Sequence, residues 1–199
     1  MDVRGNGQER VALRDKLGSA MIPAGYMAKK VCRRPEWLKT AGVDDILSLS
    51  GCISENFADY IDQWKHNGFW LFDSPDIIRT VARAKSASLV GTSLFYYEVH
   101  EMEFDGKTWN AFLPDPSFAT NVASPNNKHF EGIDVVTFFA KGAPECSPLS
   151  CNSLAEKVPT NSHCLLNSFE QAKSLLEAGK FNNSEPGPCR IFAVYSVDW

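Results

Sequence analysis

The sequence has no long apolar run and no excess of basic residues. No segment of its 199 residues approaches the roughly 20 consecutive apolar residues that a membrane-spanning helix requires. Lys and Arg number 20 against 24 Asp and Glu, which gives a formal net charge of -4. A nucleic-acid-binding surface is instead rich in Lys and Arg. We therefore expect neither a membrane protein nor a nucleic-acid-binding protein.

The N-terminal segment, residues 1–24, lacks the apolar core of a secretion signal. We therefore expect the protein to be cytoplasmic, where thiols stay reduced. The same segment contains glycine and proline with little regular apolar spacing, which predicts a loosely ordered arm. Residues 25–199 are expected to form a single domain, because an apolar fraction of 44% is ample for one packed core.

Familiar catalytic and nucleotide-binding motifs are also missing. The sequence has no P-loop, no G-x-G-x-x-G, no H-E-x-x-H and no G-x-S-x-G element. These absences exclude the easily recognised nucleotide-binding, zinc-protease and esterase classes. We expect no cofactor.

The spacing of apolar residues predicts an α+β fold. Residues 54–68 carry an apolar stripe of helical period, and Asp73-Ser74-Pro75 is a typical helix start. The Asp105-Gly106 pair predicts a hairpin turn. Strands are expected at residues 26–32, 46–50, 69–72, 94–104, 109–113 and 133–140. We predict a single mixed β-sheet of about six or seven strands with about three or four helices.

The end of the chain resembles its middle. The stretch CLLNSFEQAKSLLEA aligns with WLFDSPDIIRTVARA at a constant offset, and each is followed by an aromatic-rich strand. One interpretation is an internal repeat of two strand-helix-strand units, whose parallel strands would be joined by right-handed crossovers. The other, which we favour, is that any strand-to-helix junction selects the same capping residues.

The stretch ECSPLSCNSL places Cys146 and Cys151 around a proline, and four interpretations compete for its cysteines. As zinc ligands, Cys146, Cys151, Cys164 and Cys189 would supply four thiolates, with His163 able to replace one. Structural zinc sites usually use pairs separated by about two to four residues, and only the first two cysteines lie near each other. The spacing is therefore a weak signal for zinc.

A catalytic nucleophile is the second interpretation, with Cys151 as the best candidate. Ser153 and Glu156 resemble a capping box, which would place Cys151 just before a helix N-terminus, where a thiolate is stabilised. His163 would then act as the base, and Asn152, Asn161 or Asn167 would orient it. His100 is the other candidate base.

A disulfide between Cys146 and Cys151 is the third interpretation, and a reducing compartment argues against it. The fourth, which we favour, is that the cysteines are small apolar residues that fill space in and beside strands. In this interpretation Ser147-Pro148 forms a turn.

One face of the strand expected at residues 94–104 carries Tyr96, Glu98, His100 and Met102. Glu98 beside His100 has the residue types for acid-base chemistry. A hairpin with one solvated face has the same pattern, and we favour that interpretation. The connection at residues 114–129 is rich in turn-forming residues.

The aromatic content allows two interpretations: the aromatic side chains pack between the sheet and the helices, which we favour, or some of them are exposed and anchor an interface. Five Trp, five Tyr and thirteen Phe exceed what one core of this size must bury, and exposed aromatic side chains are good interface anchors. We therefore predict a non-catalytic cytoplasmic module that binds another protein. The alternative is a cysteine-dependent hydrolase or transferase that uses Cys151 with His163 as base.

Overall fold

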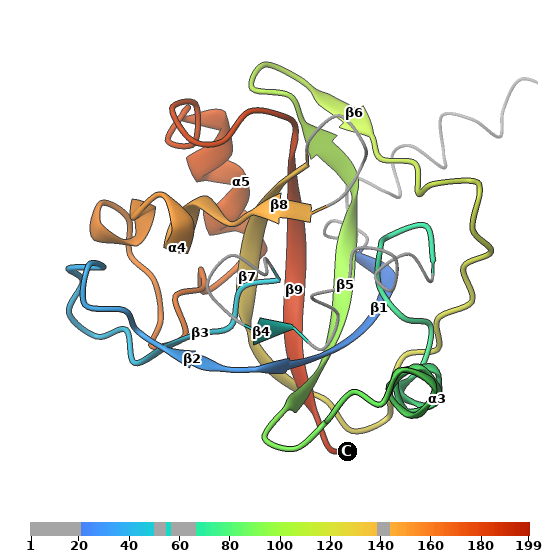
Figure 1. Cartoon of the computed structure of the whole chain (residues 1–199). Helices are drawn as coiled ribbons and strands as arrows, with labels where there is room; N and C mark the ends of the chain where they lie inside the picture. The colour runs from blue at the N-terminus through green and yellow to red at the C-terminus, as the bar shows by residue number, and fades with distance from the viewer. Residues whose placement is uncertain (1–20, 50–54, 57–66, 139–143) are drawn as a thin grey trace, which may run out of the picture.

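The computed structural model describes residues 21–49, 55–56, 67–138 and 144–199 (Figure 1). In the described residues, strands predominate and short helices lie between groups of strands. The strands are β1 (Met21–Lys30), β2 (Cys32–Arg33), β3 (Asp45–Ile46), β4 (Glu55–Asn56), β5 (Ser93–Phe104), β6 (Trp109–Ala111), β7 (His129–Phe138), β8 (Pro144–Cys146) and β9 (Cys189–Val197). The helices are α3 (Pro75–Lys85), α4 (Pro148–Cys151), the 3-10 turn η1 (Leu154–Glu156) and α5 (Phe169–Glu177).

The main sheet has the strand order β4-β1-β5-β9-β7-β8, with β6 paired to β5 as the returning arm of a hairpin. Figure 1 shows β9 standing between β5 and β7. A separate small sheet joins β2 to β3. These elements confirm the α+β class. Among the described residues, no helix combines the length and the apolarity needed to span a bilayer.

The strand directions correct the expectation of a mixed sheet, because every pair between described strands is antiparallel. The reason lies in the segments before α3 and α5, which were predicted to be sheet strands. Each makes only one isolated antiparallel bridge, Tyr26 to Phe72 and Ile133 to Leu166. The helices therefore do not connect neighbouring parallel strands.

The predicted helix starts at Ser74 and Ser168 are present. The Ser74 hydroxyl accepts a hydrogen bond from the Ile77 amide at 3.4 Å, and the Ser168 hydroxyl accepts one from the Gln171 amide at 3.2 Å. Gly179 follows α5 with a φ of +71°, the left-handed conformation that ends many helices. Local sequence therefore sets the limits of both helices.

The capping box predicted at Ser153 does not form. Ser153 has a φ of 55° and its side chain makes no capping hydrogen bond, and only the 3-10 turn η1 follows it. The helical turn lies earlier, because Pro148 begins α4 and has the backbone geometry that a first helical turn needs. Cys151 is thus the last residue of α4 rather than the residue before a helix.

Some expectations fall outside the described residues. They include residues 1–20 of the predicted arm and residues 54 and 57–66 of the helix predicted at 54–68. The described residues Glu55–Asn56 form strand β4, which corrects the first turn of that predicted helix. β1 begins at Met21 and so includes the last residues of the segment assigned to the arm.

The buried side chains form two clusters, each containing one of the longer helices. The first includes Ile78 and Ala82 of α3 with Tyr97 of β5. The second includes Ala172 and Leu176 of α5 with apolar residues of β7 and β9. The sheet therefore has an apolar core on each of its two faces.

Two loops contact strands β1 and β7 in the same way. The Asn67 amide donates to the Ala24 carbonyl at 2.9 Å, beside Gly25 of β1. The Asn161 amide donates to the Glu131 carbonyl at 2.6 Å, beside Gly132 of β7. Each asparagine also accepts hydrogen bonds from two backbone amides of its own loop.

Gly25 and Gly132 have φ values of +141° and +147°, and both lie at irregularities in strand register. A Cβ atom at Gly25 would lie 2.6 Å from the Cβ of Leu71, and one at Gly132 would lie 2.7 Å from the Cβ of Leu165. This matched geometry agrees with the two-unit interpretation. Common descent of the two units stays one of two interpretations, beside the selection of the same capping residues at any strand-to-helix junction.

Candidate functional site

Cys151 lies at the end of α4 with a half-buried side chain, and its sulfur is 3.9 Å from the Ser150 hydroxyl. Asn152 follows it and is exposed. Its amide donates to Glu185 at 3.3 Å, so it does not orient His163 in this arrangement. A catalytic role for Cys151 stays a prediction.

His163 lies between two carboxylates. Its Nδ1 is 2.7 Å from Asp45 Oδ1, and its Nε2 is 3.6 Å from Glu131 Oε2. The His163 carbonyl also accepts the Leu47 amide at 3.2 Å. The ring therefore links the segment around β3 to β7, and serving as a base for Cys151 would require it to turn away from one carboxylate.

The cysteines named as weak zinc candidates do not share one environment. Cys146, Cys164 and Cys189 are buried, and the last two belong to the core cluster that contains α5. Burial raises the pKa of Cys164 to about 12 and that of Cys189 to about 11, so both remain protonated at neutral pH. Within the described ranges, no group of three or more His, Cys, Asp or Glu side chains is placed to hold a metal ion.

Two buried ionisable side chains, Lys29 of β1 and Asp134 of β7, lie close enough to influence each other electrostatically, and the sequence reasoning missed them. Lys29 and Asp134 are both fully buried. The Lys29 ammonium donates to the carbonyls of Leu47, at 2.9 Å, and Ser48. The Asp134 carboxylate accepts from the Ser147 hydroxyl at 2.6 Å and from the Leu49 amide at 2.8 Å. The available signal was Asp134 itself, an acid inside the apolar run of residues 133–138.

Burial dominates the ionisation of this pair. It lowers the pKa of Lys29 from 10.5 to about 7, while the Asp134 charge acts in the opposite direction. It also raises the pKa of Asp134. The Tyr97 hydroxyl is buried and makes no hydrogen bond to any described residue. The Lys29 and Asp134 side chains are enclosed and bind the backbone of residues 47–49. They therefore fix that segment to the sheet rather than face a ligand.

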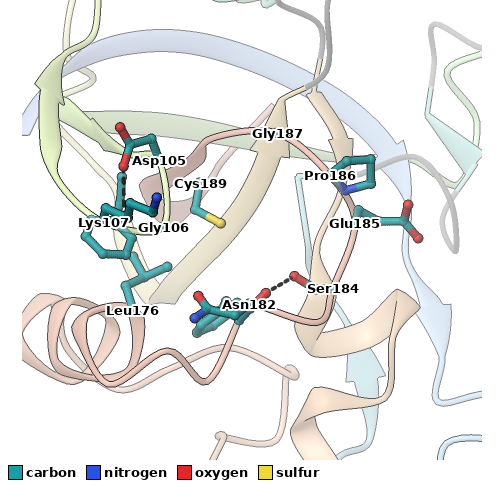
Figure 2. Close-up of a pocket in the computed structure, with 12 residues that line it drawn as sticks. Asp105, Gly106, Lys107, Leu176, Asn182, Ser184, Glu185, Pro186, Gly187 and Cys189 are labelled. Carbon is teal, nitrogen blue, oxygen red and sulfur yellow. Dashed lines mark hydrogen bonds between the residues drawn. The ribbon is translucent and has the colours of Figure 1, made fainter.

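A pocket of about 460 Å³ lies between the β5–β6 turn and the 181–187 loop (Figure 2). Its floor includes Cys189 and Leu176. At the polar rim, the Asp105 side chain forms hydrogen bonds within its own turn. Asp105 accepts hydrogen bonds from the amides of Thr108 and Lys107, and these bonds lower its pKa to about 2. The Asp105 carboxylate is therefore held by its own turn rather than directed at the pocket.

The sheet face that carries Glu98 is covered, which corrects the expectation of a solvated hairpin. His100 does not pair with Glu98. Its Nδ1 lies 3.2 Å from the Met102 carbonyl oxygen, and its ring packs 4.7 Å from the ring of Phe169 on α5. Burial lowers the pKa of His100. The acid-base pair considered from sequence is therefore absent from this arrangement of the described residues.

A row of four aromatic rings crosses the same face, one from each of four adjacent strands. Strand register places Tyr26 beside Tyr96, Tyr96 beside Tyr195, and Tyr195 beside Phe130. Successive ring centroids are 5.1, 5.8 and 5.5 Å apart. We call these four residues the aromatic row.

Glu98 and two tyrosines of the aromatic row surround a cation. The ammonium of Lys128 lies 4.2 Å from the ring centroid of Tyr195 and 4.9 Å from that of Tyr96, and it forms an ion pair with Glu98. Glu98 also accepts the Tyr195 hydroxyl at 3.0 Å and the Tyr96 hydroxyl at 3.3 Å. We call Tyr96, Glu98 and Tyr195 the cation cage.

The tyrosines of the cage stay protonated because burial raises the pKa of Tyr96 to about 12 and that of Tyr195 further still. Glu98 is 14% exposed and the Lys128 side chain 25% exposed. The site is thus partly desolvated, which strengthens both the ion pair and the cation-π contacts.

The connection between β6 and β7 covers one end of the aromatic row. The Tyr26 hydroxyl donates to the Ala123 carbonyl at 2.7 Å, and the Tyr96 and Ser124 hydroxyls share a hydrogen bond of 2.7 Å. The other end is open, since Phe130 is 44% exposed. A cavity of about 300 Å³ lies beside Lys128, lined by residues 127–129 and 196–198.

Sequence reasoning could not find this site. It identified Tyr96 and Glu98 on one strand face, but Tyr195 and Lys128 come from distant parts of the chain and join them only through strand register. Comparisons with protein-family models, characterised proteins and solved structures find no match for this chain.

Proposed function

We propose that the protein is a non-catalytic cytoplasmic module that binds a basic segment of another protein through the cation cage and the open end of the aromatic row. The single observation that carries the proposal is the lysine ammonium held by two tyrosine rings and a carboxylate. Such an arrangement recognises organic cations through ring quadrupoles and charge.

Charge favours a basic partner. Glu98 supplies a largely buried negative charge at the centre of the cage, and the chain as a whole carries a formal net charge of -4. An acidic protein attracts a basic segment over distances of about a Debye length. The buried carboxylate then determines the position of the bound cation.

Exposed rings near the cage suit an interface. Phe130 contacts Tyr195 edge-on, and Trp199 follows the C-terminal end of β9 with 42% of its surface exposed. Large, partly exposed aromatic side chains are the usual anchors of protein interfaces. Thiols at Cys32, Cys164 and Cys189 are compatible with the reducing conditions of the cytoplasm.

A binding measurement with charged peptides tests the proposal. Fluorescence anisotropy of a labelled lysine-rich peptide should show saturable binding to the wild type, and a glutamate-rich peptide should not bind. Glu98→Gln keeps the shape of the side chain and removes its charge. Introduced together with Lys128→Met, so that no internal lysine contacts the same carboxylate, it should weaken binding of the lysine-rich peptide by about tenfold relative to Lys128→Met alone.

The matched control is Glu36→Gln, also introduced together with Lys128→Met, which removes an exposed carboxylate from the turn before Leu38. This variant should bind as Lys128→Met alone does. Equal loss in both variants would mean that the peptide responds only to net charge, and the proposed function would be wrong.

A further inference from the structure

The cation in the cage belongs to the protein itself. Lys128 is the last residue before β7, which begins at His129. We propose that Lys128 is an internal occupant of the cage, and that the external ligand group is a lysine side chain of the partner, which takes its place. This inference rests on the proposed function and specifies both its ligand and its regulation.

The geometry of the cage favours lysine over arginine. A planar guanidinium prefers to stack on rings, as Arg190 does 3.5 Å from the ring centroid of Phe112 and 3.9 Å from that of Phe138. The rings of Tyr96 and Tyr195 are inclined at 41° to each other and so form a wedge rather than a flat slot. A compact ammonium on a thin alkyl stem fits a wedge, and Lys128 already occupies it.

Exchange requires little movement. Upstream of Lys128 the connection is fixed at Ser124 by the Tyr96 hydroxyl and at Ala123 by the Tyr26 hydroxyl. Downstream, His129 is already part of β7. The backbone on both sides is therefore held, while rotation of the flexible Lys128 side chain alone empties the cage. The adjoining cavity, which Lys128 itself lines, gives an incoming side chain access from solvent.

An internal occupant lowers the apparent affinity for the external one. The apparent dissociation constant equals the intrinsic value divided by the fraction of molecules whose cage is empty. A tethered lysine is present at an effective concentration of about millimolar or higher, so the empty fraction is small. Removing the Lys128 ammonium should therefore tighten binding of a lysine peptide on the order of tenfold.

The test compares Lys128→Met with Lys180→Met. Methionine keeps an unbranched stem of similar bulk, and Lys180 is an exposed lysine in the turn after α5. The probe is the peptide acetyl-Gly-Ser-Lys-Ser-Gly-amide, followed by NMR titration, with the arginine analogue as a second ligand. We expect Lys128→Met to bind the lysine peptide on the order of tenfold more tightly than the wild type does. The same variant should bind the arginine peptide less tightly than the lysine peptide. Lys180→Met should bind the lysine peptide with the affinity of the wild type.

The outcomes separate the two proposals. If the wild type binds the peptide, Glu98→Gln weakens binding in the Lys128→Met background and Lys128→Met itself leaves the affinity unchanged, the cage binds but Lys128 does not compete, and this inference is overturned alone. If neither the wild type nor Lys128→Met binds, both proposals are overturned. Should Lys128→Met unfold, Lys128→Gln provides the same comparison with a polar side chain.

Discussion

At the scale of single residues, Gly132 shows how closely two segments of this chain approach. Its φ of +147° is unfavourable for any side chain, and an added Cβ would lie 2.7 Å from the Cβ of Leu165 and 2.9 Å from the Leu166 carbonyl oxygen. Backbone strain and overpacking therefore act together at this position.

We expect Gly132→Ala to lower the free energy of unfolding by about 2 to 4 kcal/mol, measured by denaturant titration. Gly42→Ala is the matched control, because Gly42 also has a positive φ, +88°, but no atom lies within 4 Å of its added Cβ. It should lose only about 1 kcal/mol. Equal losses would show that the close approach to Leu165 has no energetic consequence.

Lys29 makes stability depend on pH. Its pKa falls from 10.5 in the unfolded chain to about 7 in the folded protein. Between these values the unfolded state binds more protons than the folded state, so stability rises with pH. The thiols of Cys164 and Cys189, whose pKa values are raised above 9, oppose this trend only above about pH 9.

We therefore expect the free energy of unfolding to increase between pH 7 and pH 9, with a contribution from Lys29 of at most about 1.4 kcal/mol per pH unit. Urea titrations at intermediate pH values measure it. The rise should be smaller in Lys29→Met, which has no ammonium to neutralise on folding. An identical rise in both proteins would contradict the assignment to Lys29.

Single residues also show which side-chain environments could not be predicted from the sequence. The cysteines attracted attention because their chemistry is distinctive, yet Cys164 and Cys189 fill the core. Asp134 carried one signal, its position inside an apolar run, but nothing in the linear sequence indicates that Lys29 is fully buried. Their proximity depends on the assembled fold, because β1 and β7 are not neighbours in the sheet.

At the scale of elements, the capping residues decide which predicted helices exist. The Ser168 hydroxyl accepts an amide of the first turn of α5, whereas the Ser153 side chain caps nothing. Ser168→Ala should therefore cost about 1 kcal/mol of stability, and Ser153→Ala less than about 0.5 kcal/mol, as measured by thermal or urea unfolding. The reverse order would mean that the sequence-based capping box at Ser153 is the correct one.

Elements set by local chemistry could be predicted from sequence, and those set by distant partners could not. The limits of α3, the hairpin turn at Asp105-Gly106 and most of β5 follow from caps, turn residues and apolar alternation. The segment at 69–72 has the composition of a strand but makes one isolated bridge to β1. Strand register, which aligns Tyr26, Tyr96, Tyr195 and Phe130, is a property of the assembled sheet.

At the scale of the whole molecule, two cores flank one antiparallel sheet. The connection between β6 and β7 covers part of one face that the cores leave open. The aromatic row lies on that face, closed at the Tyr26 end and open at Phe130. Folding alone requires neither a carboxylate in the middle of this row nor a lysine set against it. The proposed binding role is our explanation for both.

The measurement that tests this account most directly is chemical-shift mapping of the wild-type protein during titration with the lysine peptide. The account predicts concentration-dependent shifts centred on Tyr96, Glu98, Lys128, Phe130 and Tyr195, with the largest change at the Lys128 side chain as it leaves the cage. Shifts centred instead on Cys151 or on the pocket of Figure 2, or no shifts at all, would contradict it.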